Sequence, residues 1–216
     1  MAMHTITETQ TVTKEFWDKL PDRSTVDETV NALNANGFKA ESVPNRSAAL
    51  ERIRSLIPGG AQVMTGSSRT LEEIGFVGFL ASADHPWENL KAKIVAEQDK
   101  EKQLALRRQA LFADYFLGSV HAITTKGEMI AGSASGSQVA AYAYGGKNLI
   151  LVAGTNKITT DIDEGMMRLR EHTFPLEDKR MKGLGFPGTV LSKILIYERE
   201  PMRNVYVILV NEKLGF

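Results

Sequence analysis

The fold is decided by the stretch ADYFLGSVHAITTKGEMIAGSASGSQVAAYAYGGKNLILVAGTNK, residues 113–157. Residues 114–120 (DYFLGSV) and 148–154 (NLILVAG) are rich in β-branched, aromatic and leucine residues and contain or end in glycine, which predicts two buried strands. Between them, AITTKGEMI predicts two further strand halves around a turn at Lys126-Gly127, where glycine supplies a positive φ.

A loop of small residues, GSASGS at positions 132–137, follows the second strand half and opens a predicted helix, QVAAYAYG. Backbone N–H groups at such a helix start are unpaired and lie at the positive end of the helix dipole, so they favour a carboxylate or phosphate. The binding residues predicted in this loop are Ser133, Ser135, Gly136, Ser137 and Gln138.

A second loop of the same kind comes earlier, where the predicted strand AQVMTG (61–66) runs into SSRTLEEIGF. Its hydroxyl groups can bond anion oxygens, and an arginine can pair with them bidentately. The alternative is an ordinary serine or threonine helix cap, with Glu72 and Glu73 favouring the helix dipole. The loop has neither a Walker A nor a Gly-x-Gly-x-x-Gly pattern. The predicted binding residues here are Gly66, Ser67, Ser68, Arg69 and Thr70.

Three further residues are candidates because of their position in the predicted sheet. Asn156 and Lys157 follow the carboxyl end of the strand 148–154, and ligands of open α/β sheets bind beyond these strand ends. Glu128 lies between the turn and the serine loop, where a carboxylate can act as general base or nucleophile. A solvated lysine and a solvent-exposed glutamate beside a turn are the alternatives.

Composition limits the class of protein. The 216 residues carry 26 basic and 26 acidic side chains, so net charge gives no reason to expect binding to nucleic acid or to an anionic membrane. The four histidines are scattered without metal-ligand spacing, so we expect no metal site. The absence of cysteine excludes disulfides and any cofactor held by cysteine, such as a thiolate-ligated iron–sulfur cluster; no other cofactor is indicated.

The polar start MAMHTITETQTVTKEF is no signal peptide, and no apolar run is long enough to span a bilayer, so we expect a cytoplasmic protein. Helix and strand patterns alternate along the chain, which indicates one α/β domain over residues 25–216 behind an N-terminal extension, residues 1–24, that forms a helical cap. Residues 77–112 read as a charged helical cap insertion. Residues 193–197 and 205–210 read as a terminal strand pair that closes the sheet or pairs across a homodimer.

Several segments together resemble the LUD-domain family, the group that includes lactate-utilisation protein C. They are GSSRTLEEIG (66–75), AITTKGEMI (122–130), GSASGSQVAAYAYG (132–145), LVAGTNKITTDIDEGMMRLREH (151–172), PLEDKR (175–180) and VYVILVNEKLGF (205–216). The resemblance covers the chain from about residue 25 onward. It implies a fold like that of the NagB/RpiA/CoA-transferase superfamily, a three-layer, mostly parallel sheet with helices on both faces, whose ligands bind where strand-to-helix loops converge.

The resemblance also implies a function, the C component of L-lactate utilisation. Such a protein takes part in the oxidation of lactate to pyruvate beside iron–sulfur partner subunits, and here it would bind a small carboxylate or phosphorylated metabolite. Some relatives have a loop of the form Asp-Gly-x-Gly-Asn-Arg where this chain has residues 133–138, SASGSQ, so the acidic and basic side chains of that loop are missing. Two alternatives remain: a stand-alone enzyme of CoA-transferase or sugar-phosphate-isomerase type with Glu128 as its carboxylate, and a ligand-sensing subunit without chemistry.

Overall fold

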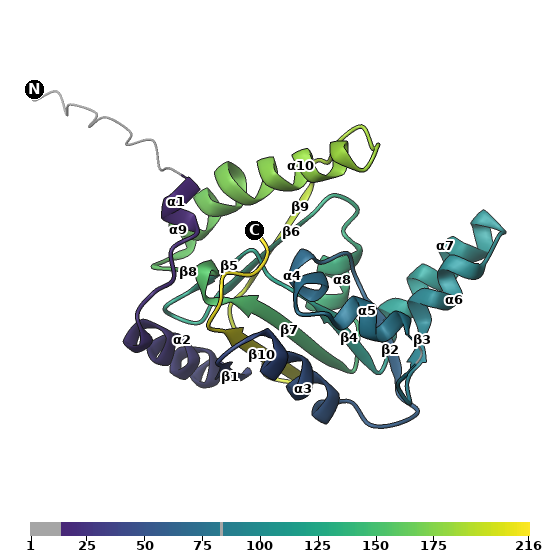
Figure 1. Cartoon of the computed structure of the whole chain (residues 1–216), viewed down its shortest axis with the longest axis horizontal. Coiled ribbons are helices and arrows are strands. Elements are labelled where there is room, and N and C mark those ends of the chain that lie inside the picture. Colours follow the sequence, from purple (N-terminus) through teal and green to yellow (C-terminus); the bar gives the residue numbers. More distant parts are fainter. Residues whose placement is uncertain (1–13, 83) are drawn as a thin grey trace, which may run out of the picture.

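A six-stranded parallel sheet forms the centre of the molecule in the computed structural model, which describes residues 14–82 and 84–216 (Figure 1). Residues 1–13 of the predicted N-terminal extension lie outside the described residues. The strands lie in the order β1 (Lys39–Val43), β10 (Asn204–Val210), β7 (Asn148–Gly154), β4 (Tyr115–Gly118), β2 (Gln62–Thr65) and β3 (Glu88–Asn89).

The central position of β7 follows from its sequence. All seven residues of NLILVAG are buried, and the strand pairs along its whole length with β10. An uninterrupted apolar run can be buried on both of its faces, as a central strand of a parallel sheet requires. The expected mixed α/β fold with a parallel sheet and an N-terminal helix is confirmed.

One face of the main sheet is covered by helices α3 (Arg46–Leu56), α4 (Arg69–Glu73) and α5 (Phe76–Ala81). Their apolar residues join those of the strands in one core cluster, which includes Ile53, Leu71 and Phe76. The opposite face packs against α2 (Arg23–Ala35), against α8 (Ser137–Ala143) and against a second, smaller sheet. The prediction of helices on both faces is right, but it did not include this second sheet.

The small sheet has the order β8 (Ile158–Thr159), β5 (Ala122–Thr124), β6 (Met129–Ser133) and β9 (Lys193–Tyr197). The predicted hairpin around Lys126-Gly127 is the antiparallel pair β5–β6. Both predicted terminal strands form, but their pairing with each other is wrong, because β9 pairs with β6 while β10 enters the main sheet between β1 and β7. The physical reason is burial: β10 is apolar and buried on both faces, whereas β9 alternates in exposure and suits a sheet edge.

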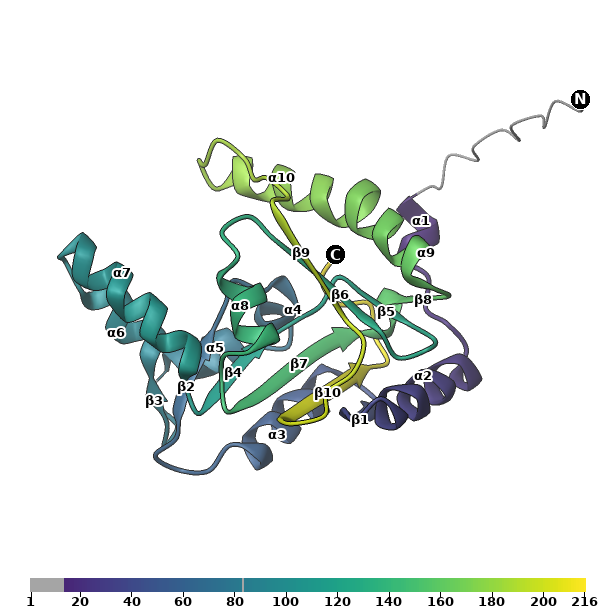
Figure 2. The ribbon, with the colours of Figure 1, turned by 180° about the vertical axis from the view of Figure 1, so that it is seen from behind.

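A continuous helical segment covers the outer face of the small sheet. It runs through α9 (Ile162–Met167), a π-helical turn η3 (Arg168–Thr173) and α10 (Phe174–Gly183), and Leu169 packs on Ala122 and Ile130. The short helix α1 (Lys14–Trp17) lies beside it (Figure 2). The segment thereby brings Arg168 and Thr173 close to the point where the two sheets meet.

The predicted cap insertion, residues 77–112, is only partly helical. Besides most of α5 it holds β3, which pairs with β2 at the edge of the main sheet, then α6 (Leu90–Ala96), α7 (Lys100–Gln109) and a 3₁₀ turn η1 (Ala110–Phe112). Helices α6 and α7 extend away from the body at this edge in both views (Figures 1 and 2). No helix in the described part of the chain is long and apolar enough to cross a membrane.

Candidate functional site

A cavity of about 490 Å³ lies beyond the carboxyl ends of the central strands. The loops that follow β2, β4 and β6 form part of its wall, together with Lys157 after β7 and one side of α10. Parallel sheets bind ligands at this edge. The structure therefore brings the two predicted loops to one place.

Most of the predicted binding residues line this cavity. They are Gly66, Ser67, Ser68, Arg69, Thr70, Ser133, Ser135, Ser137, Gln138 and Lys157. The two loops are tied directly, because the Gln138 Nε2 donates a hydrogen bond to the Ser67 carbonyl oxygen at 2.7 Å. A Cβ at Gly66 would stand 2.1 Å from the same amide nitrogen, so the present position of the Gln138 side chain depends on glycine there.

The hydroxyl groups of the serine loop bond mainly within the loop. The Ser133 Oγ accepts from the Gly136 N–H at 3.0 Å, and the Ser135 and Ser137 hydroxyls bond each other at 3.0 Å. Ser68 caps α4, as the alternative interpretation of that loop predicts. Because α4 has five residues and α8 has seven, their dipoles are short, so positive charge in the cavity comes chiefly from side chains.

Lys157 is the central charged group of the cavity. Its side chain is buried, and its Nζ donates to the Thr70 Oγ1 at 3.1 Å, the Ser119 Oγ at 3.1 Å and the Val120 carbonyl oxygen at 3.0 Å. None of these partners is a carboxylate. Burial, reinforced by the positive charge of Arg168, lowers the pKa of Lys157 to about 7, against a weaker opposing effect of Glu73.

Arg168, on the π-helical turn, is completely buried beside this lysine. Its Nη1 donates to the His121 carbonyl oxygen at 2.5 Å and to the Thr173 Oγ1 at 3.1 Å, while Nε and Nη2 have no hydrogen-bond partner within the described residues. Burial lowers its pKa to about 10, partly offset by Asp18. Two buried cations without a bonded carboxylate leave this region short of negative charge.

His121 lines the cavity as a neutral ring. Its Nδ1 accepts a hydrogen bond from the Gly132 backbone N–H at 2.9 Å, which places the ring proton on Nε2. Burial and the positive charges of Lys157 and Arg168 lower its pKa to about 3. At neutral pH the ring therefore offers an N–H donor to the cavity.

Ser119 was not predicted from the sequence, although it lines the cavity at the end of β4. The buried Tyr142 hydroxyl holds its backbone, accepting from the Ser119 N–H at 3.1 Å and donating to the Ser119 carbonyl oxygen at 3.0 Å. A Cβ at Gly118 would stand 1.8 Å from that hydroxyl. The glycine–serine pair at the end of a predicted strand could have indicated Ser119 as a site residue, but nothing in the local sequence connected it to Tyr142.

The two arginines nearest the cavity mouth are already paired. Arg69 bonds Glu73 at 2.9 Å and Glu72 at 3.2 Å, while Arg180 bonds Glu177 at 2.7 Å. Of the described residues in the predicted cap insertion, Arg107 alone lines the cavity. These exposed pairs contribute less to ligand affinity than the buried cations do.

Three predicted residues lie elsewhere. Gly136 takes a positive φ of 88° at the start of α8, and Asn156 is buried, where its Oδ1 accepts from the Leu214 N–H at 3.1 Å. Glu128 lies at the far end of the β5–β6 hairpin, bonded to the Thr124 hydroxyl, so the structure separates it from the cavity. Its expected acid or base role in this site has no geometric support.

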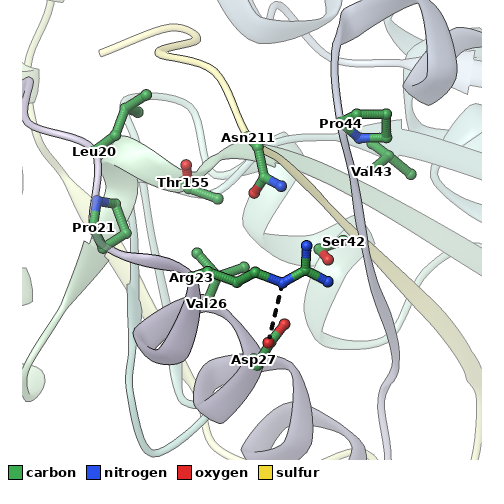
Figure 3. A pocket seen from close by; sticks show the side chains of 10 residues that line it. All are labelled: Leu20, Pro21, Arg23, Val26, Asp27, Ser42, Val43, Pro44, Thr155 and Asn211. Carbon is green, nitrogen blue, oxygen red and sulfur yellow. Dashed lines mark ion pairs between the residues drawn. The ribbon is translucent and has the colours of Figure 1, made fainter.

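A second cavity of about 340 Å³ lies beyond the carboxyl ends of β1, β10 and β7 (Figure 3). Ser42 at the end of β1, Thr155 after β7 and Asn211 after β10 form part of its wall. Arg23 and Asp27 of α2 pair with each other at 3.5 Å, so they neutralise one another. No group of three or more His, Asp or Glu side chains among the described residues is arranged to hold a metal ion.

Comparison with known proteins identifies relatives of the chain. The sequence model of the LUD domain family matches residues 26–209, whereas no curated protein matches the chain. A DUF162 family protein from Deinococcus radiodurans has a structure similar to 89% of this chain and 100% of its own, with 14% identity and a TM-score of 0.49. The eIF2B delta structure from Chaetomium thermophilum has a TM-score of 0.34 and 14% identity, and the match covers 66% of this chain and 55% of its own. The eIF2B beta structure from the same organism has a TM-score of 0.28 and 12% identity, and the match covers 77% of this chain and 59% of its own.

Proposed function

This chain belongs to the LUD domain family, and we propose that it binds a small carboxylate or phosphorylated metabolite in the cavity lined by Lys157. One observation carries the proposal: a buried ammonium group lines the cavity and, among the described residues, is bonded to hydroxyl and carbonyl oxygens but to no carboxylate. Burying such a charge is costly unless an opposite charge approaches it. An anionic ligand would supply that charge.

The rest of the cavity supports the same ligand class. Arg168 is buried behind the cavity wall rather than lining it; it adds a second positive charge next to Lys157, and its Nε and Nη2 are without hydrogen-bond partners in the described chain. Hydroxyl groups and the His121 Nε2–H add neutral donors, which suit the several oxygens of a carboxylate or phosphate.

We place the protein, as a finer proposal, in the oxidation of L-lactate to pyruvate. It would act in the cytoplasm as the anion-binding C component beside iron–sulfur partner subunits. The resemblance of the segments described above supports this role, and lactate and pyruvate are carboxylates of the proposed class. Because the chain has no cysteine, the electron-carrying clusters would belong to those partners. A homodimer stays a prediction.

Ligand binding is tested by a thermal-unfolding screen with L-lactate, pyruvate, inorganic phosphate and a sugar phosphate. A ligand at a hundred times its dissociation constant stabilises the native state by about 2.7 kcal/mol, which raises the midpoint by about 5–10 °C for a chain of this length. We expect at least one of these anions to do so, and the shift to disappear in Lys157→Met but not in Lys126→Met, which changes an exposed lysine. Unchanged midpoints with all four anions would contradict the proposal.

The lactate role needs a separate experiment. Deletion of the gene should abolish growth on L-lactate but not on pyruvate, and affinity purification of the tagged protein should recover iron–sulfur subunits. Normal growth on lactate together with the absence of such partners would contradict this finer role and would leave the anion site untouched.

A further inference from the structure

Ser119 and Lys157 stand as a hydroxyl and an amine within hydrogen-bond distance inside the cavity. The Lys157 Nζ lies 3.1 Å from the Ser119 Oγ, and both residues line the cavity wall. A serine hydroxyl is a weak nucleophile until an adjacent base takes its proton. The pair has the separation that such a transfer requires.

The surroundings of the amine suit a base. The Thr70 Oγ1 and the Val120 carbonyl oxygen accept two N–H bonds at 3.1 and 3.0 Å, which leaves the third direction of the nitrogen toward Ser119. The charged and titratable groups that face it are Arg168 on the π-helical turn, His121 after β4 and Glu73 on α4. Burial, reinforced by the positive charge of Arg168 and opposed by the negative charge of Glu73, lowers the pKa of Lys157 to about 7, so a substantial fraction of the amine carries a free electron pair at neutral pH.

Hydrogen bonds to its backbone fix the position of Ser119. Tyr142 bonds both the N–H and the carbonyl oxygen of Ser119, which makes it a positioning residue. The neutral His121 ring lines the same cavity, and its Nε2–H has no hydrogen-bond partner in the described part of the chain. A donor of this kind can stabilise the negative oxygen that develops when a carbonyl carbon is attacked.

We propose that Ser119 is the nucleophile and Lys157 the general base of an acyl-transfer site, with His121 as the donor to the oxyanion. The substrate class is an ester or thioester of a small acid that carries a second anionic group. This inference rests on the proposed function, because the anionic group is what the cavity would bind.

The reaction balances without a further cofactor. The neutral Lys157 amine takes the Ser119 proton as Oγ attacks the carbonyl carbon and a C–O bond forms. The tetrahedral intermediate collapses, its bond to the alcohol or thiol breaks, and that leaving group takes the proton from the Lys157 ammonium. Water or a second acceptor then gives a proton to the same amine and attacks the acyl carbon. The second tetrahedral intermediate collapses, the bond between the acyl carbon and the Ser119 Oγ breaks, and Oγ takes the proton back from the Lys157 ammonium.

The first test uses an alkyl fluorophosphonate, which phosphonylates activated serines with loss of fluoride. Intact mass spectrometry and peptide mapping of the full chain should find one phosphonyl group, on Ser119. The labelling rate should rise with pH around a midpoint near 7. It should vanish in Ser119→Ala and fall on the order of 10²-fold or more in Lys157→Met and Lys157→Arg. Ser55→Ala and Lys126→Met, which change exposed residues away from the cavity, are the controls.

Failure of the inference can be told apart from failure of the binding proposal. If anions raise the unfolding midpoint but folded protein leaves Ser119 unlabelled, the acyl-transfer site is refuted and the binding site stands. If borohydride reduction in the presence of pyruvate attaches the pyruvate carbon skeleton covalently to Lys157 while Ser119 stays unlabelled, the lysine is an imine-forming nucleophile and the proposal is overturned. Labelling of Ser119 without any anion-induced shift would support the dyad and refute anion binding.

Discussion

At the scale of single residues, the chain keeps a buried lysine where an apolar side chain would pack at lower cost. Lys157 is 3% exposed, and no carboxylate bonds its amine. Proteins commonly retain such unfavourable groups where function requires them. Its position was predictable from the strand before it, whereas its partners come from segments 37 to 87 residues away in sequence.

Replacing this lysine should therefore stabilise the protein. Lys157→Met keeps an unbranched side chain and removes the buried charge, and the hydrogen bond that the Ser119 hydroxyl already donates to the Thr70 Oγ1 at 3.2 Å does not depend on the lysine. We expect a gain of about 1–3 kcal/mol in the free energy of unfolding at pH 6.5, measured by urea denaturation. Lys126→Met should change it by less than about 0.5 kcal/mol. A loss of stability in Lys157→Met would show that the charge is compensated in the native state.

The pH dependence of that gain has a definite sign. The pKa of Lys157 is about 7 in the folded protein and near the ordinary lysine value of 10.5 in the unfolded chain, so between these values the unfolded chain binds the extra proton. The stability contributed by this position therefore rises with pH, by about 1.36 kcal/mol for each unit of pKa difference. The advantage of Lys157→Met over the native protein should shrink between pH 7 and pH 10. A constant difference across that range would contradict the lowered pKa.

Tyr142 gives a second prediction at this scale. Tyr142→Phe removes the hydroxyl that bonds both backbone groups of Ser119 and leaves those groups without that partner. We expect a loss of about 1–3 kcal/mol in the free energy of unfolding and slower fluorophosphonate labelling of Ser119. Tyr144→Phe, at an exposed ring directly after the same helix, is the matched control. Equal behaviour of the two variants would refute the positioning role.

At the scale of elements, the local sequence determined which strands form but not which sheet each strand joins. The predicted strands within residues 113–157 match β4, β5, β6 and β7 closely, because apolar runs and the Lys126-Gly127 turn are local signals. The division into two sheets depends on packing over long sequence distances, and so does the meeting of Ser119 with Tyr142 on α8. The two loops were predictable for the same local reason, whereas His121 and Arg168 were not.

Helix α8, which carries Tyr142, is anchored by Arg203 from the segment before β10. The guanidinium group donates to the carbonyl oxygens of Gly145 at 2.8 Å, Ala141 at 3.4 Å and Tyr142, and it pairs with the mostly buried Glu200 at 3.2 Å. These bonds satisfy carbonyl groups at the carboxyl end of a short helix, which have no partner within it.

Arg203→Met should consequently loosen both the helix and the cavity wall. We expect a loss of about 2–4 kcal/mol in the free energy of unfolding, because the variant removes charge-assisted bonds and leaves Glu200 without its cation. Labelling of Ser119 should slow at temperatures where the variant is still folded. Arg199→Met removes the same charge from an exposed position nearby and should change neither quantity. Matching results for the two arginines would show that the anchor contributes little.

At the scale of the whole molecule, the described part of the N-terminal extension that was predicted over residues 1–24 makes contacts with the rest of the fold. Trp17 is 4% exposed, and its ring lies 6.4 Å from that of His172 on the π-helical turn. Asp18 approaches His172 at 3.6 Å and pairs with Lys213 near the end of the chain at 2.6 Å. The predicted domain boundary at residue 25 stays a prediction. The polar sequence of the extension gave no sign of these contacts, because they join residues far apart in the chain.

If residues 17 and 18 belong to the folded unit, Trp17→Ala should destabilise the whole protein in one transition. The lost burial and the space left behind predict a loss of about 3–5 kcal/mol in the free energy of unfolding, measured by denaturant titration. Phe16→Ala, at the neighbouring and largely exposed ring, should cost less than about 1 kcal/mol. Because the π-helical turn that Trp17 packs against also carries Arg168, the Trp17 variant should weaken anion-induced stabilisation as well. A Trp17→Ala protein with native stability would show instead that the extension only rests on a domain that folds without it.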